Sequence, residues 1–161
     1  MSARQKGFSL IELLIVVAII LIIAAIAIPN LLRSRMAASE AAAVAALRTV
    51  NTSEIVYQSS YGNSYATGLT NLSDGGASAN CQPPTVPVAA SACLIDNALA
   101  SGTKGGYAFA YAAVAVGGIN ASYTLNGDPI GANGQRHFFT NETNVIRVNA
   151  AAPASPTDPA I

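Results

Sequence analysis

The chain has 161 residues, of which 52% are apolar and only 10% are charged, and its eight basic side chains balance its eight acidic ones. This composition excludes a disordered, highly charged chain. The zero net charge excludes nucleic-acid binding through bulk positive charge, so we predict no nucleic-acid partner. The length is that of one domain with a tail at most.

The most apolar part of the chain runs from residue 8 to residue 28. No polar side chain occurs from Leu13 to Ile28, a run of 16 residues, and adding residues 8–12 extends the segment to 21. That length matches the ~17–25 residues of a transmembrane helix. Its Ile, Leu, Val and Ala residues show no periodicity, so the helix is apolar on all sides and needs lipid or other copies of the chain to cover it.

Three interpretations of this segment compete. A cleaved secretory signal would explain the basic start at Arg4 and Lys6, but the apolar run exceeds the usual length of about 7–15 residues, and residues 26–29 make a poor cleavage site. A plain membrane anchor fits the hydropathy. Glu12 argues against both, because a carboxylate at the centre of a membrane span costs about 2.5–3.5 kcal/mol and such residues are usually functional. The third interpretation gives Glu12 a role.

Residues 6–14, with the sequence KGFSLIELL, resemble the class III signal of type IV pilins and of the pseudopilins of type II secretion. In that family, a prepilin peptidase cuts after the glycine that ends a short basic leader, and the new first residue, usually Phe, is N-methylated. The resemblance implies that residues 1–7 are the leader, that the cut lies between Gly7 and Phe8, and that Phe8 is methylated. It also identifies Glu12 as the family's glutamate.

The matched residues have physical reasons. Cutting after Gly7 would expose an amine at the tip of an apolar helix, and helix packing would strip that charge of water, which is tolerated when the charge is paired. Glu12 lies about one turn away, so it could reach the amine of a neighbouring subunit and fix the axial register. Pro29 matches the family's helix-interrupting proline. Because proline removes a backbone donor and clashes with the preceding turn, we expect a kink or a locally melted stretch there.

Residues 31–61 continue as a predicted helix, because alanine dominates their composition. An apolar stripe at helical spacing is expected to face a domain core, although Glu54 interrupts it. The stripe consists of Met36, Ala43, Leu47, Val50, Tyr57 and Tyr61. Two basic residues, Arg4 and Lys6, precede the apolar segment, and two others, Arg33 and Arg35, follow it. The distribution of positive charge therefore does not decide which end of the helix lies in the cytoplasm. The resemblance implies a cytoplasmic N-terminus and a periplasmic domain.

Residues 62–105 are rich in Gly, Ser, Asn, Ala and Pro, which predicts a long irregular loop with turns at 74–76 and 83–84. Cys81 and Cys93 lie within it, and two cysteines that close a short loop in an exported domain favour a disulfide. Free thiols are the alternative. A metal site is disfavoured because the spacing is not C-x₂-C and the one histidine is remote. Many pilins enclose the C-terminal region in their disulfide instead, so this placement departs from the family's pattern.

From residue 106 to residue 149, apolar runs alternate with turn signals, which predicts an antiparallel sheet. Strands are expected over residues 107–116, 121–126 and 145–148, and residues 135–139 could add a strand at the edge. Residues 117–120 would join the first two strands as a hairpin, and Asn126–Gly127–Asp128–Pro129 reads as a further turn. Residues 150–161 contain three prolines and no apolar pattern, so we expect a loose tail.

The sequence does not favour an enzyme. Residues 101–106 lack the Gly-Lys-Ser/Thr order of a phosphate loop, so they read as a turn before a strand. His137 stands beside two phenylalanines and is interpreted as an ordinary sheet residue. Major pseudopilins bind calcium in a C-terminal loop, and here the oxygen donors would be Asp128, Asn141 and Glu142. That cluster is sparse, so we predict no cofactor.

Together these features predict an α+β fold, with one long N-terminal helix whose second half packs on a small antiparallel sheet. The resemblance implies a structural subunit that waits in the inner membrane, is cleaved and methylated, and is then stacked by inner-membrane machinery into a helical filament of identical copies. A cell-surface type IV pilus is favoured over a periplasmic pseudopilus, because the loop is long and calcium ligands are few. The alternative is a membrane-tethered binding domain that never polymerises, which would need neither Glu12 nor the Gly7–Phe8 junction.

Overall fold

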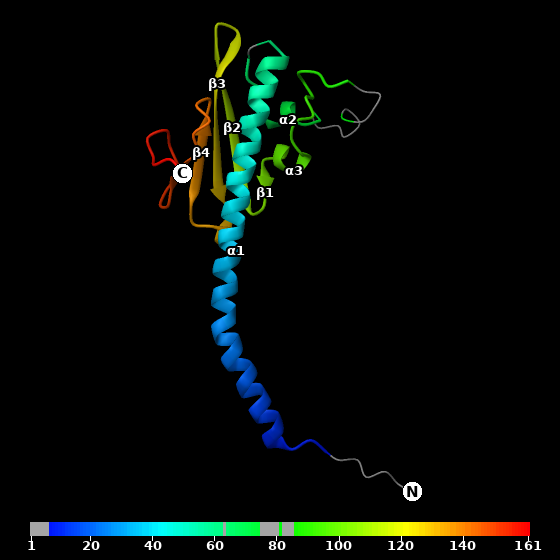
Figure 1. Ribbon diagram of the computed structural model, residues 1–161, viewed down its shortest axis with the longest axis vertical. Coiled ribbons are helices and arrows are strands. Elements are labelled where there is room, and N and C mark those ends of the chain that lie inside the picture. The colour runs from blue at the N-terminus through cyan, green and yellow to red at the C-terminus, as the bar shows by residue number, and fades with distance from the viewer. Residues whose placement is uncertain (1–6, 63, 75–80, 82–85) are drawn as a thin grey trace. The chain divides into compact units, whose positions relative to one another are not determined.

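The computed structural model describes residues 7–62, 64–74, 81 and 86–161 (Figure 1). The chain divides into two compact units, Met1–Arg35 and Met36–Ile161, and we call the second the globular unit. Helix α1, Leu10–Ser60, contributes residues to both. Residues 1–6 of the expected leader, and most of the turns expected at 74–76 and 83–84, lie outside the described residues.

The second half of α1 buries one side in the globular unit. The expected stripe is buried at Ala43, Leu47, Val50 and Tyr57, and Tyr61 packs against the same cluster from just beyond the helix end. Polar side chains share this buried side, namely those of Glu40, Asn51, Ser53 and Glu54. The side of α1 that faces the core is therefore mixed in polarity, as the interruption at Glu54 indicated.

The locally melted stretch expected at Pro29 is not found, because α1 continues through this residue from Leu10 to Ser60, and the alternative expectation of a kink there stays a prediction. Proline removes only its own hydrogen bond to the carbonyl four residues earlier, and helices in apolar surroundings tolerate that loss. Melting at Pro29 during assembly therefore stays a prediction about a different state of the chain.

A five-stranded antiparallel sheet forms the other layer of the globular unit, in the order β1-β2-β3-β4-β5. The strands are β1 Thr103–Lys104, β2 Tyr107–Val116, β3 Ile119–Pro129, β4 His137–Asn141 and β5 Arg147–Asn149. Side chains of α1 and of the sheet meet in one cluster that includes Leu47, Val50, Tyr107, Phe109, Leu125 and Phe138. The predicted α+β fold, with a long N-terminal helix and an antiparallel sheet, is confirmed.

The turn expected at residues 126–129 is wrong, because these residues belong to β3. Gly127 pairs with Phe109 on β2, and a Cβ atom at Gly127 would lie 3.4 Å from the Phe109 ring. The glycine thus provides room for an aromatic ring rather than a change of chain direction. The separate hairpin turn expected at residues 117–120 is confirmed, because Gly117 and Gly118 join β2 to β3 and both have positive φ angles.

The connection between α1 and β2 contains more regular structure than expected. It holds two short helices, α2 Leu69–Leu72 and α3 Asn97–Ala100, as well as strand β1. Leu69, Leu72 and Leu99 are buried and join the core cluster. These apolar side chains attach the Gly- and Ser-rich connection to the core of the globular unit. The prediction of an irregular loop over residues 62–105 is therefore only partly correct.

The C-terminal tail is not loose. The Val148 amide donates to the Pro159 carbonyl, and the Ile161 amide donates to the Ile146 carbonyl, so the tail pairs with the free side of β5. Asp158 accepts hydrogen bonds from the Ser155 amide and hydroxyl, which closes a turn in the tail. The prolines remove backbone donors but keep their carbonyl acceptors, which is why this pairing survives in a proline-rich segment.

Candidate functional site

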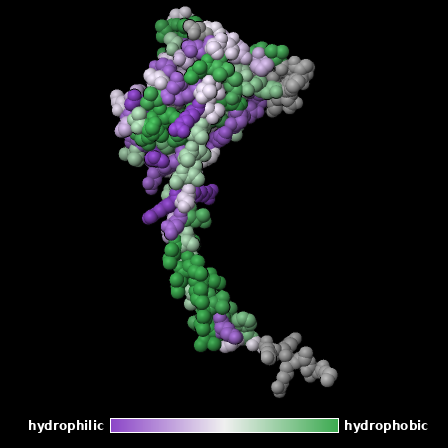
Figure 2. All heavy atoms as spheres, in the orientation of Figure 1, coloured by the Kyte–Doolittle hydropathy of each residue, from purple (hydrophilic) through white to green (hydrophobic). Residues whose placement is uncertain are grey.

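The first part of α1 exposes an apolar surface. None of residues 7–35 is buried, and the large apolar side chains from Leu10 to Leu32 are between 45% and 80% exposed. Figure 2 shows this part of the helix as mostly hydrophobic on the visible face, with a hydrophilic patch near its N-terminal end. By length and composition the helix could cross a membrane. Because exposed apolar surface costs roughly 25 cal/mol per Å² in water, this segment requires a cover of lipid or protein.

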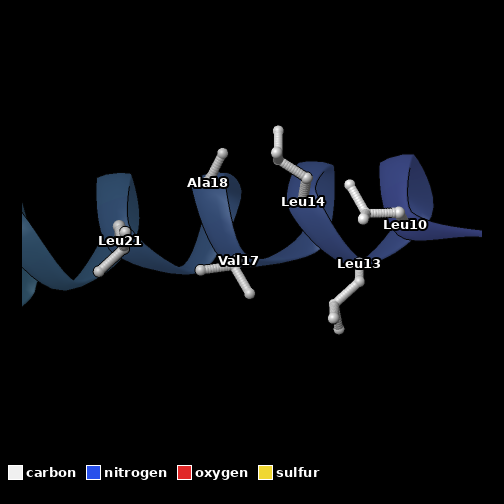
Figure 3. Close-up of a pocket in the computed structure, with 6 residues that line it drawn as sticks. All are labelled: Leu10, Leu13, Leu14, Val17, Ala18 and Leu21. Atoms are coloured by element: carbon white, nitrogen blue, oxygen red, sulfur yellow. The ribbon is translucent and has the colours of Figure 1, made fainter.

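One side of this helix carries a shallow apolar hollow. Its lining residues are Leu10, Leu13, Leu14, Val17, Ala18 and Leu21, which recur at steps of three and four and so share one side of the helix. Figure 3 shows the short Ala18 side chain between the longer leucines at 14 and 21. A small residue among large ones leaves space that a side chain of a second helix can fill. The hollow is therefore suited to helix packing.

The carboxylate of Glu12 lies at the N-terminal tip of the same helix. The Ser9 backbone amide donates a hydrogen bond to Glu12 Oε2 over 2.9 Å. Ser9 directly precedes α1 and Glu12 is three residues later, which is the spacing of a capping box. The N-terminus of a helix carries partial positive charge, so it stabilises the carboxylate there.

The Gly7–Phe8 peptide bond lies just outside the helix. Residues 7–9 adopt neither helix nor strand, and the Phe8 side chain is 81% exposed. A Cβ atom at Gly7 would meet no other atom within 4 Å. This bond is therefore open to an enzyme, as a processing site must be.

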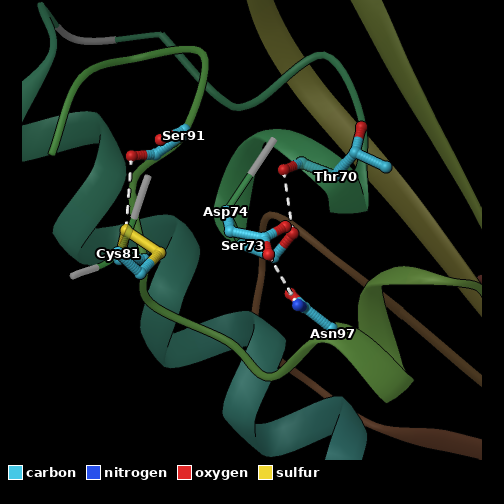
Figure 4. Close-up of a disulfide and its surroundings, with 7 residues drawn as sticks. Thr70, Ser73, Asp74, Cys81, Ser91 and Asn97 are labelled. Atoms are coloured by element: carbon cyan, nitrogen blue, oxygen red, sulfur yellow. Dashed lines mark hydrogen bonds between the residues drawn. A yellow bond between two sulfur atoms is a disulfide. The ribbon is translucent and has the colours of Figure 1, made fainter. Parts of the chain in front are cut away.

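The cysteines of the globular unit form the predicted disulfide. Cys81 and Cys93 are bonded, with their Cα atoms 5.6 Å apart. Figure 4 shows the bond beside Asp74, whose carboxylate accepts a 2.6 Å hydrogen bond from the Asn97 side chain. The disulfide and this hydrogen bond hold the segment between α2 and α3 from two sides.

The residues considered for calcium do not converge. Asp128 Oδ1 lies 2.6 Å from Nδ1 of His137, at the start of β4. Asn141, at the other end of β4, uses its side-chain oxygen to accept from the Thr143 amide and hydroxyl. Four residues along a strand span about 13 Å, too far for ligands of one ion. Among the described residues no cluster of three or more His, Cys, Asp or Glu side chains could hold a metal.

Comparison with known proteins gives a consistent picture of the N-terminal segment. Residues 2–28 match the family model of the prokaryotic N-terminal methylation motif. Over 69 residues the chain is 45% identical to the type IV wide pilus major component PilA4 of Thermus thermophilus, a match that covers 43% of this chain and 52% of that protein. Over the matched segments the chain is thus similar to proteins with the N-terminal methylation motif and to a type IV pilin. It spans about half the length of the curated relative that it matches.

Three of the residues singled out from the sequence lie inside the matched motif: Gly7, Phe8 and Glu12. Pro29 lies one residue beyond the motif's end. Their individual roles in cleavage, methylation and assembly stay predictions.

Sequence reasoning missed two buried acidic residues of α1. Glu40 accepts hydrogen bonds from the backbone amides of Gln135 and Arg136 and from the Arg136 side chain, at 3.0, 3.3 and 2.7 Å. Glu54 is fully buried, and its Oε1 lies 2.6 Å from the Tyr111 hydroxyl. The interruption of the apolar stripe was a signal for Glu54, whereas no local pattern pointed to Glu40, whose partners lie more than 90 residues away.

Proposed function

We propose that this chain is the structural subunit of a type IV pilus. It is held in the inner membrane by the apolar part of α1, with its N-terminus in the cytoplasm and the globular unit in the periplasm. Prepilin peptidase cuts after Gly7 and methylates Phe8, and inner-membrane machinery then adds the subunit to a helical filament of identical copies. The observation that carries this proposal is the exposed apolar surface of residues 10–32, which begins inside the methylation motif.

Assembly exchanges a lipid cover for a protein cover. Lipid tails are as apolar as leucine, so this exchange brings little hydrophobic free energy, and helix contacts in a membrane depend on packing and polar interactions. The hollow around Ala18 offers the packing. Glu12 offers the polar interaction, because its carboxylate would neutralise the Phe8 amine of a neighbouring subunit as both leave water. The pair would fix the axial position of one subunit against the next.

Two observations favour a pilus over a pseudopilus. The relative that is 45% identical to this chain over 69 residues is described as the major component of a type IV wide pilus. The oxygen donors considered for a pseudopilin calcium site do not converge, because Asp128 lies near the end of β3 and contacts His137, whereas Asn141 lies at the far end of β4 and accepts from Thr143. We propose a structural role with no catalytic residue and no cofactor.

Electron microscopy of a strain that lacks this chain, combined with a secretion assay, tests the proposal. We expect surface filaments to disappear, secretion to continue, and the intact gene to restore filaments. Loss of secretion with filaments retained would assign the chain to a type II secretion pseudopilus instead. If neither filaments nor secretion changes in that strain, and the protein of the native strain is monomeric in the membrane fraction, the chain is a tethered domain and the proposal is wrong.

A further inference from the structure

The globular unit contains a buried acid that the proposed assembly does not use. Glu54 projects from α1 into the space between the helix and the sheet and has no exposed surface. Its Oε1 lies 2.6 Å from the Tyr111 hydroxyl of β2. Its Oε2 accepts from the Ala66 amide over 3.1 Å. Glu54 thus joins helix, sheet and the segment that follows α1.

The hydrogen bonds around Tyr111 require one more proton than an ionised Glu54 provides. The Tyr111 hydroxyl lies 2.6 Å from Glu54 Oε1 and 2.9 Å from the Ala66 carbonyl oxygen. A hydroxyl has a single hydrogen to donate. While Glu54 is ionised, neither of these two oxygens carries a hydrogen, so both can only accept. If Oε1 carries a proton, Glu54 donates to the Tyr111 oxygen and Tyr111 donates to Ala66. Both short contacts are then satisfied.

The surroundings also disfavour a charge on Glu54. The titratable groups that face it are tyrosines: Tyr57 from α1, Tyr111 from β2 and Tyr123 from β3. Tyr65, from the segment after α1, contacts the Tyr123 ring, and Glu142 also acts on Tyr123. The ion pairs of the described residues lie elsewhere, at Asp96, Asp128 and Glu40. None of these ion pairs involves Glu54, so no cation in them compensates its buried carboxylate.

Burial is the main influence on this group and raises the pKa of Glu54 above its usual 4.5, although the hydrogen bonds from Tyr111 and Ala66 oppose it. Burial also raises the pKa of Tyr111 and of Tyr123, so both phenols keep their hydrogens as donors. These directions agree with the geometry.

The segment held by Glu54 also holds the tip of the β2–β3 hairpin. The Asn120 amide donates to the Ser64 hydroxyl, and its side chain donates to the Tyr65 carbonyl. The Tyr65 amide in turn donates to the Asn120 carbonyl over 3.0 Å. Residues 64–66 therefore connect the buried acid to the hairpin tip.

We propose that Glu54 is protonated in the folded globular unit and that its proton locks residues 64–66, and with them the hairpin tip, against α1. The contribution of this lock to stability is fully present below the unfolded-state pKa of Glu54. It is lost as the pH rises through the higher folded-state value, because ionisation adds an unpaired charge and takes the Tyr111 hydrogen from Ala66.

The direct test is carbon NMR of the full chain in detergent micelles, with the glutamate side-chain carboxyls labelled. The chain has only four glutamates, Glu12, Glu40, Glu54 and Glu142, so single Glu→Gln variants assign each signal. In a pH titration we expect the Glu54 carbon to move from its protonated to its ionised position at a higher pH than the carbon of glutamate in an unstructured peptide does. A Glu54 carbon that moves at the same pH as that peptide, or at a lower one, would overturn the proposal, whatever the stability of the Glu54→Gln variant.

Hydrogen exchange at the Ala66 amide supplies the second test. Above the folded-state pKa of Glu54, its protection factor should fall in the native chain by up to about tenfold per pH unit. In Glu54→Gln, where the amide NH₂ replaces the acid's donor, protection should be independent of pH. The exposed residue Glu142 provides the control, since Glu142→Gln should behave as the native chain does. Equal pH dependence in the native chain and in Glu54→Gln would contradict the lock.

Discussion

The Ser9 amide and the Glu12 carboxylate of one chain are joined by a 2.9 Å hydrogen bond at the tip of α1. Cleavage after Gly7 would create the Phe8 amine one residue before this amide. A carboxylate has about four lone-pair positions, so Glu12 could keep its own helix capped while it accepts a neighbour's amine. The carboxylate is thus positioned before assembly begins.

Processing should depend on Gly7. In Gly7→Val we expect only full-length precursor in the membrane, because the branched side chain would occupy the place where the family's peptidase accepts glycine. Mass spectrometry of the native protein should show a chain that begins at an N-methylated Phe8. Gly68→Ala is the matched control, because a Cβ atom there would lie 3.9 Å from the nearest side-chain atoms, so this variant should be processed normally. A native chain that begins at Met1 or near Ala27 would contradict the processing site.

The Cys81–Cys93 bond should stabilise the globular unit. A disulfide that closes a loop of this length, with a sequence separation of 12, is worth about 3 kcal/mol in the chain-entropy model. We therefore expect Cys81→Ser and Cys93→Ser to lower the free energy of unfolding by about that amount, as judged by chemical denaturation. Reduction of the native chain should give the same loss, and its unreduced form should be about 2 Da lighter than its reduced form. Labelling of both thiols in the native, unreduced protein would refute the bond.

Glu40 should produce a pH dependence opposite to that of Glu54. Burial is the largest influence and raises the pKa of Glu40, but the Gln135 amide and the Arg136 side chain together outweigh it and hold that pKa below 4.5. The stability that Glu40 contributes is therefore present above its unfolded-state pKa and lost as the pH falls through the folded-state value. Glu40→Gln should lower the free energy of unfolding by about 1.5–3 kcal/mol at neutral pH. It should also make the free energy of unfolding fall less steeply as the pH becomes acidic.

Circular dichroism during denaturation at a series of pH values measures this effect. Glu142 is exposed, so Glu142→Gln serves as a charge-matched control. In this variant the free energy of unfolding should fall at acidic pH as it does in the native chain. If the free energy of unfolding of Glu40→Gln falls at acidic pH as steeply as that of the native chain, the contacts with Gln135 and Arg136 do not stabilise the ionised form of Glu40.

The sequence was sufficient for features that depend on local pattern or on pairs close in the chain. These include the apolar helix, the hairpin between β2 and β3 and the Cys81–Cys93 bond. The strand at residues 126–129 was missed, because Asn-Gly-Asp-Pro is a strong turn signal and the ring that packs over Gly127 comes from another strand. Tertiary packing overrode local turn chemistry there.

The buried polar contacts could not be predicted for a related reason. Glu54 and Tyr111 are separated by 57 residues, and Glu40 and Arg136 by 96. A periodic pattern can show that an acid interrupts an apolar stripe, but it cannot name the partner that makes its burial tolerable. The pairing of the tail with β5 was missed likewise, because the proline carbonyl that accepts there has no signature in composition.

Assembly should fail when Glu12 loses its charge. Glu12→Val should insert, be cut after Gly7 and accumulate in the membrane, because a carboxylate has left an apolar helix. The mutant's Phe8 amine would then be buried in the filament without a partner. Co-expression with the native chain should allow partial incorporation, since a native neighbour still offers its own Glu12. Complete exclusion of the mutant would indicate a role within one chain instead. Ile11→Val, which keeps the apolar surface beside Glu12, is the control and should assemble normally.

The central claim is that the apolar helix assembles filaments through the Glu12 carboxylate, and counting surface filaments by electron microscopy in cells that express only Glu12→Val tests it most directly. Few or no filaments, with normally cut and methylated subunits in the membrane, is the predicted result. Filaments in normal number would contradict the charge-pair account and leave hydrophobic packing of residues 8–28 to drive assembly by itself.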